Sequence, residues 1–227
     1  GLGGDGADTL ATVGIGAGGL VIGLAVSRLS LWLAALDGEA TRAATLKRDA
    51  MISLMAGGLG VWAALASPTL FFASVSAVLA WQLLMLAVVV GENFWLPVVL
   101  TWPLIVTGLL AAWWLETDIL LARAIGAAAG FGLLWGLGWL YRRMRGRDGL
   151  GGGDPFLMAG AGAWVGWMGL ASVMLWAGAA GLSLVVARRI TGKAVSGQDA
   201  LPFGVFLAIG IWLTWLYGPL GLAISGR

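Results

Sequence analysis

Long apolar segments, each about the length of a membrane-spanning helix, constrain the fold of this chain more than any other feature. A helix needs about 20 consecutive, mostly apolar residues to cross the hydrocarbon core of a bilayer. Hydrophobic residues make up 60% of the 227 residues and charged residues 11%, whereas soluble domains carry about 25% charged residues. The sequence therefore predicts an all-α bundle of membrane helices, with no polar gap long enough for a soluble domain.

Eight apolar segments are predicted to cross the membrane. They occupy residues 10–27, 51–66, 69–91, 96–115, 119–141, 155–168, 170–187 and 203–223. A single helix over residues 155–187 would be about 50 Å long, which is too long for one crossing. We therefore predict two short passes there, with a break near Gly166 and Gly169.

Basic side chains set the predicted orientation. They cluster in three segments between spans: Arg28, Arg42, Lys47 and Arg48 in the first, Arg142, Arg143, Arg145 and Arg147 in the second, and Arg188, Arg189 and Lys193 in the third. Lysine and arginine accumulate in cytoplasmic loops, so all three segments are predicted to face the cytoplasm. The N-terminal segment, with Asp5 and Asp8, and the C-terminus then lie outside.

The chain contains neither cysteine nor histidine. Their absence excludes disulfides, zinc–thiolate sites, haem ligation by histidine and nucleophilic catalysis by either residue type. We therefore predict no cofactor and no metal ion, with membrane lipids rather than nucleic acid as partners. The 14 tryptophans are predicted to anchor the helices at the membrane interface and to pack between them, in preference to contacting a chromophore.

Glycine is abundant, at 38 residues, and its spacing predicts close helix packing. Gly126 and Gly130 form a GxxxG pattern, and Gly160, Gly162 and Gly166 continue the run of small residues. Such residues let the backbones of membrane helices approach closely.

Ionisable side chains near or within the spans are the candidate functional residues, because such groups are costly in a membrane. Asp154 opens the sixth span, after Gly151, Gly152 and Gly153. The glycines permit a tight turn, and Pro155 would occupy the first helical position, where proline is common. Asp154 is therefore predicted to be the N-cap, accepting hydrogen bonds from backbone N–H groups.

Four other ionisable groups lie at the ends of predicted spans. Glu92, in the segment GENFWLP, is predicted to share the cytoplasmic face with Asp154. Glu116, Asp118 and Arg123 are predicted to lie at the outer face. Asp118 and Arg123 are close enough in sequence for a weak contact, and we favour an ion pair at a polar boundary over a functional site there.

Four segments resemble motifs of one protein family. GLGGGDPFLMAGAGAW, at residues 149–164, is similar to the motif GxGGGDxKLLAALGAW of the type IV prepilin leader peptidases, which are intramembrane aspartic proteases of inner membranes. The other three are LPVVLTWPLIVTGLL at residues 96–110, DILLARAIGAAAGFGLLWGLGWLY at 118–141 and LPFGVFLAIG at 201–210. The resemblance extends from about residue 80 to the C-terminus, and the eight predicted spans match the family's fold.

This resemblance implies a single integral membrane domain over residues 1–227. Residues 10–50 would supply the first span and a short cytoplasmic loop, and residues 51–227 the peptidase-like helix bundle. Family members often carry a cysteine-rich zinc module in the first loop and methylate the cleaved pilin. Because this chain has no cysteine, we do not expect N-methylation in that form.

The resemblance implies catalysis by two aspartates. Two carboxyl groups that share a site can differ in protonation, so that one acts as a base on water and the other as an acid. Asp154 matches one of them. The other belongs to an ID-x-E motif, seven residues before the proline of LP. Val90 stands at that position, and Glu92 matches the second acid of the motif.

Two further departures fall in the same motifs. Val98 replaces the aspartate of LPD, and Phe156 replaces the lysine of GDxK. Valine cannot bind or release a proton, and moving a catalytic group by about 1 Å can lower the rate about a hundredfold. The implied catalytic site is therefore degenerate at its first aspartate.

The resemblance and its departures together predict a prepilin-peptidase-like protein of the bacterial inner membrane that has lost proteolysis. It would act as a structural or assembly subunit, bound to other integral membrane proteins. The alternative is an active prepilin leader peptidase that uses Asp154 and Glu92 on a pilin-like substrate. A transporter is disfavoured, because no predicted span carries a central acid or base.

Overall fold

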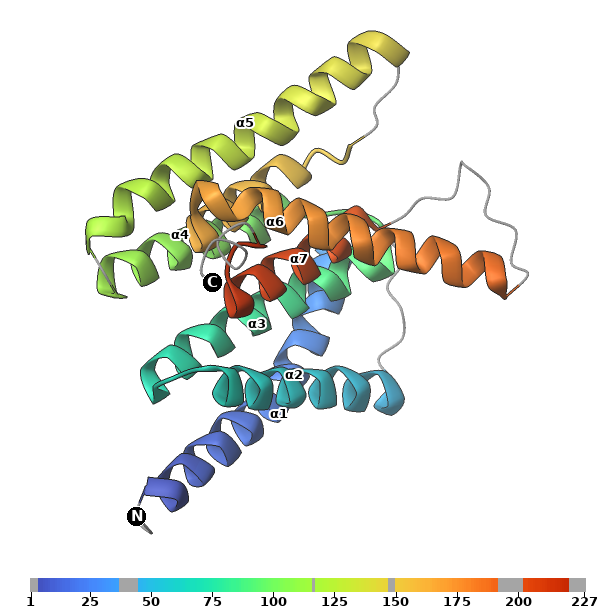
Figure 1. Cartoon of the computed structure of the whole chain (residues 1–227). Coiled ribbons are helices and arrows are strands. Elements are labelled where there is room, and N and C mark those ends of the chain that lie inside the picture. The colour runs from blue at the N-terminus through green and yellow to red at the C-terminus, as the bar shows by residue number, and fades with distance from the viewer. Residues whose placement is uncertain (1–3, 37–44, 116, 147–149, 192–201, 221–227) are drawn as a thin grey trace. The chain divides into compact units, whose positions relative to one another are not determined.

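The computed structural model describes residues 4–36, 45–115, 117–146, 150–191 and 202–220, with side chains from residue 8 onward. Within these ranges every regular element is a helix (Figure 1). The elements are α1 (Gly4–Leu36), α2 (Leu46–Ala66), α3 (Leu70–Asn93), α4 (Val98–Leu115), η1 (Thr117–Ile119), α5 (Leu120–Arg145), α6 (Asp154–Ile190) and α7 (Phe203–Tyr217). The predicted all-α fold is confirmed.

Among the residues that the structure describes, six helices, α1 to α6, are long and apolar enough to cross a membrane. The last one, α7, is equally apolar in character but shorter, at 15 residues. The chain is thus a multi-pass membrane protein. The predicted spans at 155–168 and 170–187 both lie within α6, and the number of crossings remains a prediction.

Contacts among the helices divide the chain into two compact units, Gly1–Asn93 and Phe94–Arg227. The first unit contains α1 to α3, and the second contains α4 to α7. Each unit has its own buried apolar side chains, such as Leu79 and Leu86 in the first and Leu157 and Leu207 in the second. That the two form one membrane domain remains a prediction.

In the first unit, α1 packs on α2 and α3, and small residues line the contact with α2. A Cβ atom added at Gly23 would lie 2.4 Å from the Cα of Ser53, and one at Gly19 would lie 2.6 Å from the carbonyl oxygen of Ala56. Trp81 of α3 donates its indole N–H to the same carbonyl, at 3.0 Å. The close approach of α1 and α2 therefore depends on glycine, which has no Cβ atom, at positions 19 and 23.

In the second unit, α6 packs against α4, α5 and α7. It is interrupted at Gly166, which has a φ of 73° and a ψ of 174°. A positive φ is readily adopted only by glycine, and in Figure 1 the two parts of α6 run in different directions. The predicted break near Gly166 is confirmed, whereas Gly169 lies inside the second helical part.

The GxxxG pattern of α5 forms the contact with the first part of α6. A Cβ atom added at Gly126 would lie 2.6 Å from the carbonyl oxygen of Gly162, and one at Gly130 would lie 2.3 Å from that of Met158. Trp164, further along α6, donates its indole N–H to the carbonyl of Leu104 in α4, at 2.9 Å. The predicted close packing through glycine is confirmed.

Candidate functional site

Asp154 is the first residue of α6, and its side chain is buried, with the residue 6% exposed. Its Oδ2 accepts a hydrogen bond from the backbone N–H of Gly151, at 3.1 Å. Its own backbone N–H donates to the carbonyl of Gly151, at 3.2 Å. The carboxylate is therefore held against the turn that precedes α6.

The prediction that Asp154 is the N-cap is wrong. The N-cap is Gly153, which makes no side-chain capping bond, and Asp154 already belongs to the first helical turn. From that position the side chain reaches backward to the N–H of Gly151 rather than forward to the free N–H groups of the helix, as an N-cap side chain does.

The three motif glycines before Asp154 have different surroundings. A Cβ atom at Gly153 would lie 2.5 Å from the carbonyl oxygen of Leu96, so this position allows the turn to approach the start of α4. A Cβ atom at Gly151 would lie 3.3 Å from Oδ2 of Asp154, and one at Gly152 would meet nothing within 4 Å. Close packing therefore requires glycine at Gly153 above all.

Phe156, which stands where the resembled motif has lysine, lies in an aromatic cluster. Its ring centroid is 5.0 Å from that of Phe131 in an edge-to-face arrangement, and 6.4 Å from that of Trp102. These separations are typical of favourable aromatic pairs. The side of α6 next to Asp154 thus packs through apolar rings against α4 and α5.

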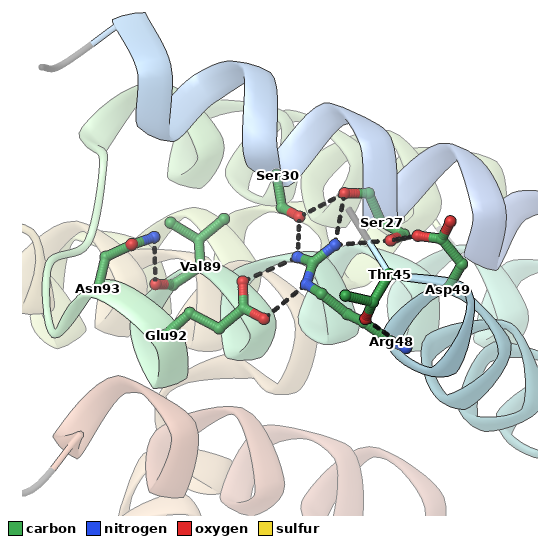
Figure 2. A network of polar contacts seen from close by, with 8 residues as sticks. All are labelled: Ser27, Ser30, Thr45, Arg48, Asp49, Val89, Glu92 and Asn93. Carbon is green, nitrogen blue, oxygen red and sulfur yellow. Dashed lines mark hydrogen bonds and ion pairs between the residues drawn. The ribbon is translucent and has the colours of Figure 1, made fainter. Parts of the chain in front are cut away.

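Glu92 lies in the last turns of α3, and its carboxylate is bound by Arg48 of α2 (Figure 2). Nε of Arg48 donates to Oε1 of Glu92 at 2.7 Å, and Nη2 donates to Oε2 at 2.8 Å. This is a bidentate pair, the strongest common geometry for arginine and carboxylate. Both oxygens of Glu92 are therefore engaged inside the first unit.

Arg48 uses all five of its N–H donors in this network. Besides the two bonds to Glu92, Nη1 donates to the carbonyl oxygen and to Oγ of Ser27, and Nη2 donates to Oγ of Ser30. Arginine has five such donors and no acceptor, and the residue is only 9% exposed. The network therefore satisfies a buried cation completely and ties α1, α2 and α3 together.

The network continues to a second acid, Asp49. The hydroxyl of Ser27 donates to Oδ1 of Asp49, and Nη2 of Arg28 donates to Oδ2 at 2.7 Å. Asp49 is buried, whereas the side chain of Arg28 is 64% exposed. Two acids and two arginines thus alternate across the three helices, with opposite charges as neighbours. Figure 2 shows Arg48, Asp49 and Glu92 of this network.

The two sequence-predicted acids belong to different units. Glu92 lies in the first, within the network around Arg48, and Asp154 lies in the second, against the turn before α6. Val90, which the sequence resemblance matches to the first aspartate of the family, is 4% exposed. Within the described residues, acids do not gather in groups of three that could hold a metal ion.

In the first turn of α5, Arg123 lies over an aromatic ring. Its Cζ is 5.9 Å from the ring centroid of Trp215 in α7, within the range of a cation–π contact. The ion pair with Asp118 remains a prediction, and Glu116 lies outside the described residues.

Sequence reasoning missed the role of Arg48. It used Arg48 only as one of several basic residues that set orientation. Two features of the sequence could have indicated this role. Arg48 lies in the first turn of an apolar helix, and Ser27 and Ser30 lie three residues apart near the end of the preceding helix. Which helices pack together, and so which acid meets this arginine, required the structure.

Comparison with known proteins finds one family. Residues 77–186 match the model of the type IV leader peptidase family. A prepilin leader peptidase/N-methyltransferase of Burkholderia pseudomallei (strain 1026b) is 37% identical over 175 residues, which are 77% of this chain and 55% of the relative. A protein of the same description from Dichelobacter nodosus is 36% identical, over 78% of this chain and 60% of the relative. One from Pseudomonas aeruginosa is 33% identical, over 81% of this chain and 64% of the relative.

The chain spans about half to two thirds of the length of these curated relatives. No solved structure matches it. The chain is a multi-pass membrane protein that is similar to prepilin leader peptidases over most of its own length.

Proposed function

We propose that this chain is a member of the type IV leader peptidase family that has lost proteolysis and serves as a structural or assembly subunit of a membrane complex. Membership is supported by the match over residues 77–186 and by relatives at 32% to 37% identity. The proposed loss of proteolysis rests on the residues matched to the family's catalytic positions, Val90 and Asp154, and on the neighbouring acid Glu92.

One observation carries this proposal: Arg48 binds both carboxylate oxygens of Glu92. Val90, which the resemblance matches to the first aspartate, has no proton to exchange. Glu92, two residues further along the sequence, is then the nearest acid in the sequence that could replace that aspartate. A general acid or base must be able to reach the proton that it transfers. Glu92 is instead committed to a bidentate pair inside the bundle of α1, α2 and α3, which favours a structural role for this carboxylate.

Asp154 keeps a structural role under this proposal. It is buried and accepts the N–H of Gly151, and it holds the turn that passes the start of α4 at Gly153. A carboxylate that organises a turn can persist without a catalytic partner. The alternative, an active peptidase in which Asp154 and Glu92 act as general acid and base on a pilin-like substrate, requires Glu92 to leave Arg48.

For its location, we propose the bacterial inner membrane, with the N-terminus outside. The proposal rests on the basic residues at the ends of α5 and α6, which follow the rule for cytoplasmic loops. Other integral membrane proteins are the proposed partners. Large apolar side chains exposed on several helices, among them Trp113, Trp135 and Trp167, are available for lipids and for such partners.

The first prediction is that the purified chain does not cleave a type IV prepilin. The protein is incubated in detergent–phospholipid micelles with a prepilin, and leader removal is followed by mass spectrometry. The prepilin leader peptidase of Pseudomonas aeruginosa serves as the positive control. Cleavage that disappears in both the Asp154→Asn and the Glu92→Gln variants would overturn the proposal in favour of the active peptidase.

The second prediction concerns the proposed role as a subunit. The tagged chain, expressed at its native level and extracted in a mild detergent, is expected to elute from a sizing column with other integral membrane proteins in fixed ratio. The same chain, extracted in a harsher detergent that separates complexes, is the control. Elution as a single chain in every mild detergent tried would contradict the assembly role while leaving the family membership untouched.

A further inference from the structure

The end of α5 extends beyond the turn that precedes α6. A Cβ atom added at Gly138 would lie 3.8 Å from the Cβ of Leu150, which places the turn opposite this point of α5. The residues that follow, from Trp139 to Arg145, are exposed or half-buried. In Figure 1 this end of α5, in yellow, projects past the start of α6. Its surface is therefore open to the surroundings of the second unit.

This end of α5 carries a cluster of cations. Arg142, Arg143 and Arg145 lie in the last turn, and all three are exposed. The Cζ of Arg143 lies 5.3 Å from the ring centroid of Trp139, a distance at which ring and guanidinium attract one another. The planar guanidinium stacked on a ring keeps its edge N–H donors free to bind an anionic group such as a phosphate.

Apolar side chains adjoin the cations along the same helix. Trp135, Trp139 and Arg143 follow one another at intervals of four residues, which places them along one side of α5. Leu140 and Met144 form the neighbouring row. Trp135 and Met144 are 58% and 75% exposed. A strip of exposed apolar groups thus ends in guanidinium groups at the end of a membrane-spanning helix.

We propose that this end of α5 binds an anionic phospholipid. The phosphodiester of its headgroup would contact Arg142 and Arg143, which lie three and four residues after Trp139 and so one turn from its ring. Its acyl chain would lie along Trp135, Trp139 and Leu140. A lipid fits this surface because the surface joins a cationic end to an apolar strip, as the lipid joins an anionic end to an apolar chain. Tryptophan at the headgroup level is typical of membrane interfaces.

The end of α6 provides a matched control. Arg188 and Arg189 also lie in the last turn of a membrane-spanning helix, and both are exposed. The residues four positions before them are Leu184 and Val185, so no aromatic ring lies one turn below either arginine. Both pairs of arginines complement the helix dipole equally. A difference between the pairs therefore measures the site rather than the charge.

The test is lipid binding by the full chain in a neutral detergent, measured by native mass spectrometry with added phosphatidylglycerol or phosphatidylcholine. A cation near an anionic surface contributes about a fivefold increase in affinity. We therefore expect the double variant Arg142→Gln/Arg143→Gln to bind phosphatidylglycerol about 25-fold more weakly, and Arg188→Gln/Arg189→Gln to change less than fivefold. Circular dichroism checks that both variants keep their helices.

Three outcomes would overturn the proposal. Equal losses in the two double variants would mean that only net charge matters. Equal affinity of the unchanged protein for phosphatidylcholine would exclude recognition of the anionic headgroup. Full competition by inorganic phosphate, together with no effect of Trp139→Leu, would mean that the arginines bind a free anion and that the apolar strip takes no part.

Discussion

The variant Arg48→Met is expected to lower the unfolding free energy of the first unit by about 3–5 kcal/mol, the usual cost of removing one partner from a buried ion pair. Methionine fills much of the volume of the arginine stem but donates no hydrogen bond. Five bonds disappear at once, and Glu92, Ser27 and Ser30 lose their donors. The side chain of Glu92 is 21% exposed, so water can replace the guanidinium only in part.

Arg28→Met is the matched control for this prediction. Arg28 also donates to an acid at 2.7 Å, but its side chain is 64% exposed. Exposed pairs contribute at most about 1 kcal/mol. Because Asp49 is buried, the loss of Arg28 is expected to exceed that value but to stay below the loss of Arg48, which is itself buried and makes five hydrogen bonds. Both variants remove one positive charge and introduce the same side chain. The measurement is denaturant unfolding in detergent micelles, followed by circular dichroism. A loss in Arg48→Met no larger than that in Arg28→Met would show that the network does not hold the three helices together.

The same network explains why the candidate site could be predicted only in part. The sequence identified Glu92 as an acid near a predicted catalytic position, and the structure places it at the end of α3. Its partner Arg48 is 44 residues away in the sequence. A pairing at that separation depends on how α2 and α3 pack, which a pattern of apolar residues along one helix does not specify.

Local constraints, in contrast, were predicted well. The break in α6 was predicted from the length of the apolar stretch, which exceeds one crossing, and from the basic segments at both of its ends. The structure places the break at Gly166, where the φ is positive. The packing of α5 on α6 followed from Gly126 and Gly130. The N-cap at Asp154 was wrong by one residue, since a glycine can start a helix without a side-chain bond.

The variant Gly130→Ala is expected to separate α5 from α6, although it adds a single methyl group. That carbon would lie 2.3 Å from the carbonyl oxygen and 2.9 Å from the carbonyl carbon of Met158. Both are backbone atoms of a neighbouring helix, so no side-chain rotation relieves the overlap. Overpacking of a closely packed contact costs about 1–3 kcal/mol, and we expect a loss at the upper end of that range.

The variant Gly132→Ala, two residues further along the same helix, is expected to raise the unfolding free energy rather than lower it. A Cβ atom at Gly132 would meet nothing within 4 Å, so the substitution adds no overlap. Alanine favours a helix over glycine by about 1 kcal/mol, and the intrinsic gain is the same at both positions. The two variants should therefore change the unfolding free energy with opposite signs, measured by thermal unfolding in one detergent. Stabilisation by both would mean that α5 and α6 do not approach through Gly130, because helix propensity alone would then account for the result.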